Sequence, residues 1–174
     1  LDSTTTQAET YDTVASEIVD DVMLGYNGTI LSYGQTGTGK TYTIFGGGMD
    51  WLPNFNDVHS FQSKDWLEQS KAGIIPRSVN QIFEDIDKMK NEIDFNVTIS
   101  FLQIYMDNIM DLFDNSKTNL QIREAPKVGI FVDGITHILV TKPEEIIALV
   151  KEGSKNRNIA KTYMNDISSR SHVI

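Results

Sequence analysis

Apolar residues recur every three or four positions near the start of the chain, and this period predicts an amphipathic helix. The apolar positions are Tyr11, Val14, Ile18, Val22 and Met23. With 3.6 residues per turn they fall on one face, and most of the carboxylates between them fall elsewhere. Thr6 and Glu9 have the spacing of a capping box that opens the helix, and Gly25 is a plausible end.

Two later stretches have the same helical period. In the first, Pro76 stands in the opening turn, and the apolar positions are Val79, Ile82, Phe83, Ile86 and Met89. In the second, Thr141 is a candidate N-cap and Pro143 opens the helix, whose apolar face is Ile146, Ile147, Leu149 and Val150. We place Lys151 and Lys155 near the C-terminal end of this helix, where cations suit its dipole.

Runs of β-prone residues lie between these helices. Residues 29–33 are a short run of this kind, and residues 97–105 form a longer one with little polar alternation, which predicts a central strand. Residues 120–123, 129–132 and 137–140 are expected as short strands separated by turns. The alternation of strands and helices predicts an α/β fold with a mixed central sheet and helices on both faces.

The run at 29–33 leads into a glycine-rich loop with chemical meaning. Residues 34–41 fit the pattern G-x-x-x-x-G-K-[ST] of a phosphate-binding loop (P-loop), and they are Gly34, Gln35, Thr36, Gly37, Thr38, Gly39, Lys40 and Thr41. The glycines let backbone N–H groups turn inward around an anion. Lys40 would reach the β- and γ-phosphates, and Thr41 would bind Mg²⁺. The positive end of the dipole of the following helix would also attract the phosphates. A glycine-rich turn that binds nothing is the alternative.

Composition and charge limit the classes of function. The chain has 174 residues, enough for one domain with a real core, and it contains no Cys and hence no disulfide or thiolate metal site. It has neither an apolar run long enough for a membrane span nor a signal peptide, and without an initiator Met it begins mid-protein or was cropped.

The charge is unevenly distributed. Residues 1–116 hold 18 acidic and 6 basic side chains, and residues 117–174 hold 6 acidic and 9 basic. The acidic part argues against nucleic acid as a partner, and no membrane partner is expected. The basic surplus could face an anionic partner or simply be solvated surface.

Two other features have open interpretations. Residues 46–72 form a long connection without periodicity, typical of a functional or disordered segment, in which Trp51, Phe55, Phe61 and Trp66 could pack as a small cluster or contact a ligand. Asp107 follows a hydrophobic strand and is a candidate Mg²⁺ carboxylate, although a turn residue is the favoured interpretation. The spacing of Asp111 and Asp114 suggests a short exposed helix.

A second polar constellation lies at residues 165–172, Asn-Asp-Ile-Ser-Ser-Arg-Ser-His. Its hydroxyls suit Mg²⁺-bound water and phosphate oxygens, and its Arg suits phosphate or carboxylate. Serine-rich loops are common, so an ordinary polar loop is the simpler interpretation of these residues alone. His172 by itself favours a structural role.

Residues 26–43 together with residues 165–172 resemble the kinesin motor domain closely. Gly73 to Arg77, Leu120 to Glu124, and Asn156-Arg157 are also similar to kinesin signatures, so that the resemblance covers nearly the whole chain. It implies a P-loop NTPase fold and a microtubule-stimulated ATPase that uses ATP/ADP and Mg²⁺. It also implies a location on microtubules in the cytoplasm, where the tubulin partner is bound through the complete motor.

The resemblance also implies roles for single residues. Thr36 to Thr41 would hold the phosphates and the metal, and Tyr42 would lie near the adenine. Residues 165–172 would be the first switch, which closes over the γ-phosphate, and residues 46–72 a long form of the loop that interrupts the helix after the P-loop. Within the switch, Asn165 would support the nucleotide pocket. Ser168 and Ser169 would contact Mg²⁺, phosphate or the attacking water, and Arg170 would pair with a glutamate of the second switch. In that fold the strand near Asp107 is not the metal-binding one.

Some family motifs do not occur in these 174 residues. They are the Arg-x-Arg-Pro adenine contact, the second switch Asp-Leu-Ala-Gly-Ser-Glu and the main tubulin-binding helix. We therefore expect the isolated chain to bind nucleotide weakly, to turn over near background and to be poorly soluble. The alternatives are another P-loop NTPase, although a guanine-binding Asn-Lys-x-Asp is absent, or a non-catalytic microtubule-binding module. Direction of movement, cargo, subfamily and oligomeric state are not predicted.

Overall fold

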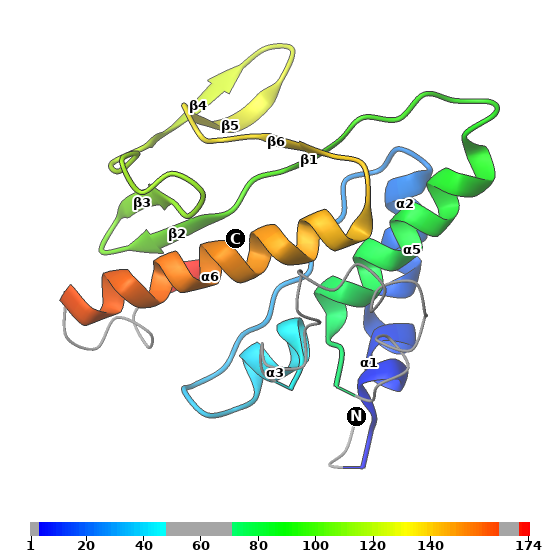
Figure 1. Ribbon diagram of the computed structural model, residues 1–174, viewed down its shortest axis with the longest axis horizontal. Coiled ribbons are helices and arrows are strands. Elements are labelled where there is room, and N and C mark those ends of the chain that lie inside the picture. The colour runs from blue at the N-terminus through cyan, green and yellow to red at the C-terminus, as the bar shows by residue number, and fades with distance from the viewer. Residues whose placement is uncertain (1–3, 48–70, 164–170) are drawn as a thin grey trace. The chain divides into compact units, whose positions relative to one another are not determined.

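The computed structural model describes residues 4–47, 71–163 and 171–174, which combine helices and strands as the α/β prediction requires (Figure 1). The helices are α1 Gln7–Val14, α2 Ser16–Met23, α3 Lys40–Phe45, α5 Ile74–Met89 and α6 Pro143–Tyr163. Two compact units divide the chain, one comprising Leu1–Phe95 with Lys142–Ile147 and the other Asn96–Thr141 with Ala148–Ile174. No helix of the described residues is long and apolar enough to cross a membrane.

The predicted first helix is two helices with a break at Ala15. The capping box of Thr6 and Glu9 is confirmed at the start of α1. Near the break, the Ser16 hydroxyl donates to the Asp12 carbonyl oxygen at 3.0 Å, and such back-bonding bends helices. The buried stripe therefore differs from the predicted one: Ala15 and Val19 are buried, whereas Val14 and Val22 are about two-fifths exposed.

Gly25 ends α2 as predicted, but the segment after it is not a strand. The Gly25 N–H donates to the Val22 carbonyl and the Tyr26 N–H to the Asp21 carbonyl, which is a Schellman motif with Gly25 at φ 97°. Residues 26–34 then run without a ladder partner among the described residues. Leu31 and Tyr33 are 85% and 95% exposed, since β propensity alone cannot supply the paired neighbour that a strand requires.

In the first unit, α1 and α2 lie alongside α5 (Figure 1). The helical period predicted α5 correctly, with Pro76 in its first turn. Tyr11, Ala15 and Ile74 form a small core, against which Ile30 and Ile44 pack. At its edge the Tyr11 hydroxyl donates to Gln81 Oε1 at 2.5 Å, so that a buried polar group ties the first helix to α5.

The second unit contains three small antiparallel sheets in the described residues, with the orders β1-β6, β3-β2-β7 and β4-β5. The strands are β1 Val97–Ile99, β2 Leu102–Tyr105, β3 Asn108–Asp111, β4 Gln121–Ala125, β5 Gly129–Asp133, β6 Ile138–Val140 and β7 Ser171–Val173. The short strands expected after residue 119 are confirmed. The described strands thus pair antiparallel in separate sheets and not as one mixed sheet.

The long predicted strand 97–105 divides at Ser100 and Phe101. Before this point the chain pairs with β6, and after it β2 pairs with β3 and β7. Ser100 Oγ lies 2.8 Å from His137 Nδ1 where the chain changes partners. The expectation of a central strand is therefore confirmed for β2.

The turn after β2 decides between the two interpretations of Asp107. Met106 and Asp107 have φ of 47° and 61° and join β2 to β3 as the two-residue loop of a hairpin, so Asp107 is a turn residue as favoured. The short helix suggested by Asp111 and Asp114 is wrong, because Asp111 ends strand β3. Its buried carboxylate accepts N–H bonds from Phe113 at 2.8 Å and from Thr136 at 2.7 Å, and it thereby organises the loop.

Helix α6 is longer than predicted. It opens at Pro143 as expected, but it extends to Tyr163, so that Lys151 and Lys155 lie in its middle and not near its end. Helix α6 continues past Gly153. An added Cβ there would lie 2.4 Å from Phe101 Cδ1, so this glycine serves close packing of α6 against the second unit's sheet.

Candidate functional site

The P-loop connects the segment 26–33, which is not a strand, to helix α3. Of the strand–loop–helix context expected for the motif, the loop and the helix are present. Gly37 and Gly39 have φ of 87° and 90°, a region that favours glycine. Gly39 is the N-cap of α3, and the Thr43 N–H donates to its carbonyl at 2.8 Å. The loop therefore ends directly on the first turn of a helix, where N–H groups lack intrahelical partners.

The Lys40 side chain folds back over the loop. Its Nζ donates to the carbonyl oxygens of Gly34 and Gln35, each at 2.6 Å. The Thr38 hydroxyl also donates to the Gln35 carbonyl, at 2.9 Å. A Cβ on Gly34 would lie 2.7 Å from Thr38 Oγ1, so this position has no room for a side chain. The ammonium is thus held at the loop by neutral acceptors that phosphate oxygens can replace.

The other predicted contacts of the loop are at the surface. Gln35, Thr36, Thr41 and Tyr42 are exposed, and Tyr42 lies in α3. A hydroxyl at the first turn of the helix and an exposed ring next to it are accessible to a ligand. The roles of Thr41 toward Mg²⁺ and of Tyr42 toward adenine stay predictions.

Contacts that the sequence did not indicate hold α3 in place. Buried Gln7, the first residue of α1, donates from Nε2 to the Tyr42 carbonyl at 2.6 Å. At the other end of α3, Gly46 pairs with Ala72 in an isolated bridge, and the Gly47 N–H donates to the Lys71 carbonyl at 2.9 Å. No periodicity or motif marks Gln7, because its partner is 35 residues away.

The same contacts close the base of the 46–72 insert. A Cβ on Gly73 would lie 2.6 Å from the Gly46 nitrogen and 2.7 Å from the Thr43 and Ile44 carbonyl oxygens. Only glycine allows the start of α5 to approach the end of α3 this closely. Residues 48–70 lie outside the described residues, and with them the aromatic cluster expected from Trp51, Phe55, Phe61 and Trp66.

Most of the second constellation also lies outside the described residues. This applies to Asn165, Ser168, Ser169 and Arg170, whose roles stay predictions. The last part of the segment is described, because Ser171 and His172 belong to β7 and pair with Tyr105 and Ile104 of β2. His172 is exposed in a strand, and the Ser171 hydroxyl accepts a hydrogen bond from Arg157 at 3.2 Å.

The described part of the site fits a nucleotide's phosphates. It offers a lysine ammonium, glycines that leave backbone N–H groups uncovered, and the start of a helix, which together form a donor set for an anion. Thr41 adds an oxygen of the kind that Mg²⁺ accepts. Clusters of three or more His, Asp or Glu side chains arranged to hold a metal do not occur among the described residues.

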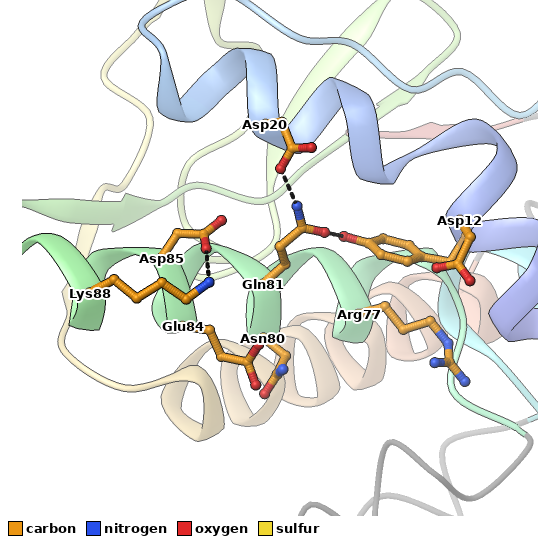
Figure 2. A pocket seen from close by; sticks show the side chains of 9 residues that line it. Asp12, Asp20, Arg77, Asn80, Gln81, Glu84, Asp85 and Lys88 are labelled. Carbon is orange, nitrogen blue, oxygen red and sulfur yellow. Dashed lines mark hydrogen bonds and ion pairs between the residues drawn. The ribbon is translucent and has the colours of Figure 1, made fainter.

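A separate cavity of about 410 Å³ opens between the helices of the first unit (Figure 2). Its lining comprises Tyr11, Asp12, Asp20, Arg77, Asn80, Gln81, Glu84, Asp85 and Lys88. Carboxylates outnumber cations, and none of the lining residues belongs to the P-loop. A triphosphate would meet repulsion here, so this cavity is a poorer candidate for the predicted nucleotide site than the loop at 34–41.

A lysine-bearing glycine loop that opens a helix within an α/β fold is typical of the class of P-loop proteins. The sequence model of the kinesin motor domain matches residues 1–174. The chain therefore belongs to the kinesin motor domain family.

Individual relatives agree with this assignment. The chain is 44% identical over 170 residues to kinesin heavy chain of Strongylocentrotus purpuratus, and 40% identical over 172 residues to kinesin-related protein 3 of Dictyostelium discoideum. These matches cover 98% and 99% of this chain but only 15% and 13% of the relatives. The chain thus spans a small part of the length of the curated relatives that it matches.

A solved structure supports the fold. The chain matches it with a TM-score of 0.83 and 35% identity, over 97% of this chain and 43% of that one. Its title is "Structure of a fast kinesin: Implications for ATPase mechanism and interactions with microtubules". The resemblance drawn from the sequence is therefore confirmed at the level of family and fold.

Proposed function

We propose that this chain is the ATP-binding part of a motor that couples ATP hydrolysis to movement along microtubules. The observation that carries the proposal is the position of Lys40, whose ammonium lies 2.6 Å from two carbonyl oxygens of the P-loop, in a member of the kinesin motor domain family. Phosphoryl transfer depends mostly on positioning and on electrostatic stabilisation, and this loop offers both.

The chain's own residues have distinct roles in this proposal. Lys40 leaves the Gly34 and Gln35 carbonyls for the β- and γ-phosphates and stabilises the charge that develops on them. Thr41 and Ser169 would hold Mg²⁺, which supplies further neutralisation of phosphate charge when bound. Ser168 and Ser169 orient the attacking water, and Arg170 pairs with a carboxylate of the second switch.

We propose microtubules as the macromolecular partner, bound through the complete motor in the cytoplasmic cytoskeleton. The charge of the chain suggests that nucleotide binding and tubulin binding belong to different segments of the motor. Residues 1–116 carry 18 acidic and only 6 basic side chains, whereas tubulin has an acidic surface. Tubulin contacts therefore come mainly from segments other than these residues.

The 174-residue polypeptide alone is expected to bind nucleotide and to hydrolyse ATP less well than the complete motor. Its sequence contains no Asp-Leu-Ala-Gly-Ser-Glu segment, so neither the second-switch Asp nor the partner of Arg170 is supplied. We propose that it binds nucleotide weakly and turns over ATP near background, without microtubule stimulation.

Phosphate release by the complete protein tests the proposal. We expect Mg·ATP hydrolysis that rises on addition of microtubules, with ATP preferred over GTP in competition. The Lys40→Ala variant should lose both the basal and the stimulated rate. Nucleotide binding without hydrolysis would favour the alternative of a non-catalytic microtubule-binding module. A preference for GTP would favour another class of P-loop NTPase.

A further inference from the structure

Helix α1 has two buried residues, and the side chain of each is bonded to another helix of the first unit. Gln7 and Tyr11 are 5% and 6% exposed, and their spacing of four places them on one face of α1. Gln7 Nε2 donates to the Tyr42 carbonyl oxygen in α3 at 2.6 Å. The Tyr11 hydroxyl donates to Gln81 Oε1 in α5 at 2.5 Å. One face of α1 therefore holds α3 with its first residue and α5 one turn later.

The bond from Gln7 is important because α3 has little support of its own. This helix has six residues, none of them buried, and its N-terminus has no side-chain cap. An isolated helix this short is unstable in water. Nearer its C-terminal end, Ile44 packs against the core and Gly46 forms a bridge to Ala72. Gln7 contacts the helix closer to the P-loop than these residues do, only two positions after Lys40.

The Tyr42 carbonyl does not depend on Gln7 for its hydrogen bond. The Gly46 N–H donates to the same oxygen at 2.9 Å, as the α-helical pattern requires. Removal of the Gln7 amide therefore leaves this acceptor paired and avoids the penalty of a buried unsatisfied group. The loss is a connection between α1 and α3, so its main consequence should be for the position of α3 and not for the stability of the fold.

We propose that Gln7 is a positioning residue for the nucleotide site, which acts through the Tyr42 backbone on Lys40 and Thr41. The bond of Tyr11 attaches α1 to α5, and Gln7 extends this attachment to the first turn of α3. Lys40 and Thr41 belong to that turn, and their donors and oxygens must meet the phosphates in one geometry. This inference rests on the proposed function, because the position of α3 affects binding only if the nucleotide lies at the P-loop.

A glutamine-to-methionine substitution in the complete protein tests this role. Methionine has a similar length and shape but lacks the amide donors. In Gln7→Met the Kd for Mg·ADP, a ligand without a γ-phosphate to hydrolyse, should rise about 3- to 10-fold. This is the equivalent of one neutral hydrogen bond.

Gln81→Met is the matched control, because Gln81 is bonded to Tyr11 and Asp20 and not to α3. The substitution removes two side-chain bonds between helices, so it should lower Tm more than Gln7→Met does. The Kd for Mg·ADP should nevertheless change less than twofold. Stability and affinity should thus rank the two variants in opposite order, which a purely structural role of Gln7 would not produce.

Three results would overturn the inference. They are an unchanged Kd in Gln7→Met, equal losses of affinity in the two variants, and failure of Gln7→Met to fold, which would make the bond a structural one. A failure of the proposed function is distinguishable, because Lys40→Ala would then bind Mg·ADP as tightly as the unmodified protein. If Lys40→Ala loses binding and Gln7→Met keeps it, the P-loop assignment holds and the role of Gln7 is wrong.

Discussion

Lys40 donates to the carbonyl oxygen of Gly34 at 2.6 Å, across the full length of the P-loop. The residue that would neutralise phosphate charge is thus already bound to the first residue of the loop. In the proposed function, the ammonium exchanges these neutral carbonyl acceptors for the charged oxygens of a triphosphate, which form stronger bonds. We therefore expect the Lys40 side chain to stay at the loop when its acceptors change.

Lys40→Ala should remove nucleotide binding with little effect on folding. The acceptors it leaves belong to a partly exposed surface loop, so water can replace the ammonium. For the unmodified chain, ligand at a hundred times Kd stabilises by about 2.7 kcal/mol, or roughly 5–10 °C in Tm for a chain of this size. A thermal-shift titration with Mg·ATP should show this shift in the unmodified chain and none in the variant. An equal shift in both would contradict the assignment of the site.

Gly73→Ala should destabilise the junction between α3 and α5. Its Cβ would lie 2.6 Å from the Gly46 nitrogen, a backbone atom that cannot rotate away. We expect a loss of about 3 kcal/mol in the free energy of unfolding and weaker nucleotide binding, because α3 carries Lys40 and Thr41. Urea unfolding and the same nucleotide titration would measure both effects.

Gly129→Ala provides the matched control for this junction. Gly129 is the first residue of β5 and has φ 77°, but no atom lies within 4 Å of the position of its added Cβ. Only backbone strain of about 1–2 kcal/mol applies there. Equal costs at Gly73 and Gly129 would mean that close packing of α3 against α5 is unimportant.

Local signals in the sequence were sufficient for part of this structure. The P-loop and α5 depend on spacings within a few residues, so the motif and the helical period located both of them. The capping box of Thr6 and Glu9 and the turn at Gly25 are equally local, and both were confirmed. The family followed from two long motifs taken together.

Interactions between distant residues account for what was missed. The break at Ala15 places this residue in a core with Ile74, 59 positions later in the numbering. Asp111 is buried because its carboxylate accepts hydrogen bonds from N–H groups later in the chain, including that of Thr136. Gln7 supports α3 through a bond to Tyr42. None of these residue types is unusual where it stands, so spacing alone gave no indication of their roles.

Gly153→Ala in helix α6 should destabilise the second unit, against the usual helix preference. In an open helix, alanine would be favoured over glycine by about 1 kcal/mol. Here the added Cβ would lie 2.4 Å from the Phe101 ring, and overpacking of this kind costs about 1–3 kcal/mol. Urea unfolding should show a lower free energy of unfolding for the variant. Combining it with Phe101→Leu should recover part of the loss, and stabilisation by Gly153→Ala alone would refute the packing argument.

Tyr11→Phe should change how stability depends on pH above pH 10. Burial raises the pKa of Tyr11 from 10.0 to about 12, with the negative charges of Asp20, Asp12 and Asp85 adding to it against a lowering by Ser78. Below pH 10 the phenol is protonated in both the folded and the unfolded states. Between pH 10 and 12 only the unfolded chain ionises, so folding loses up to about 2.7 kcal/mol over these two pH units.

Phenylalanine lacks this titration, so the difference between the two proteins should depend on pH. At pH 7 we expect Tyr11→Phe to be less stable by about 1–2 kcal/mol, because Gln81 Oε1 loses the donor 2.5 Å away. As the pH rises toward 12 this deficit should shrink and then reverse. Urea unfolding of both proteins across this range cancels the titration of other tyrosines and of lysines. Parallel curves would show that the Tyr11 hydroxyl is in contact with water in the folded state.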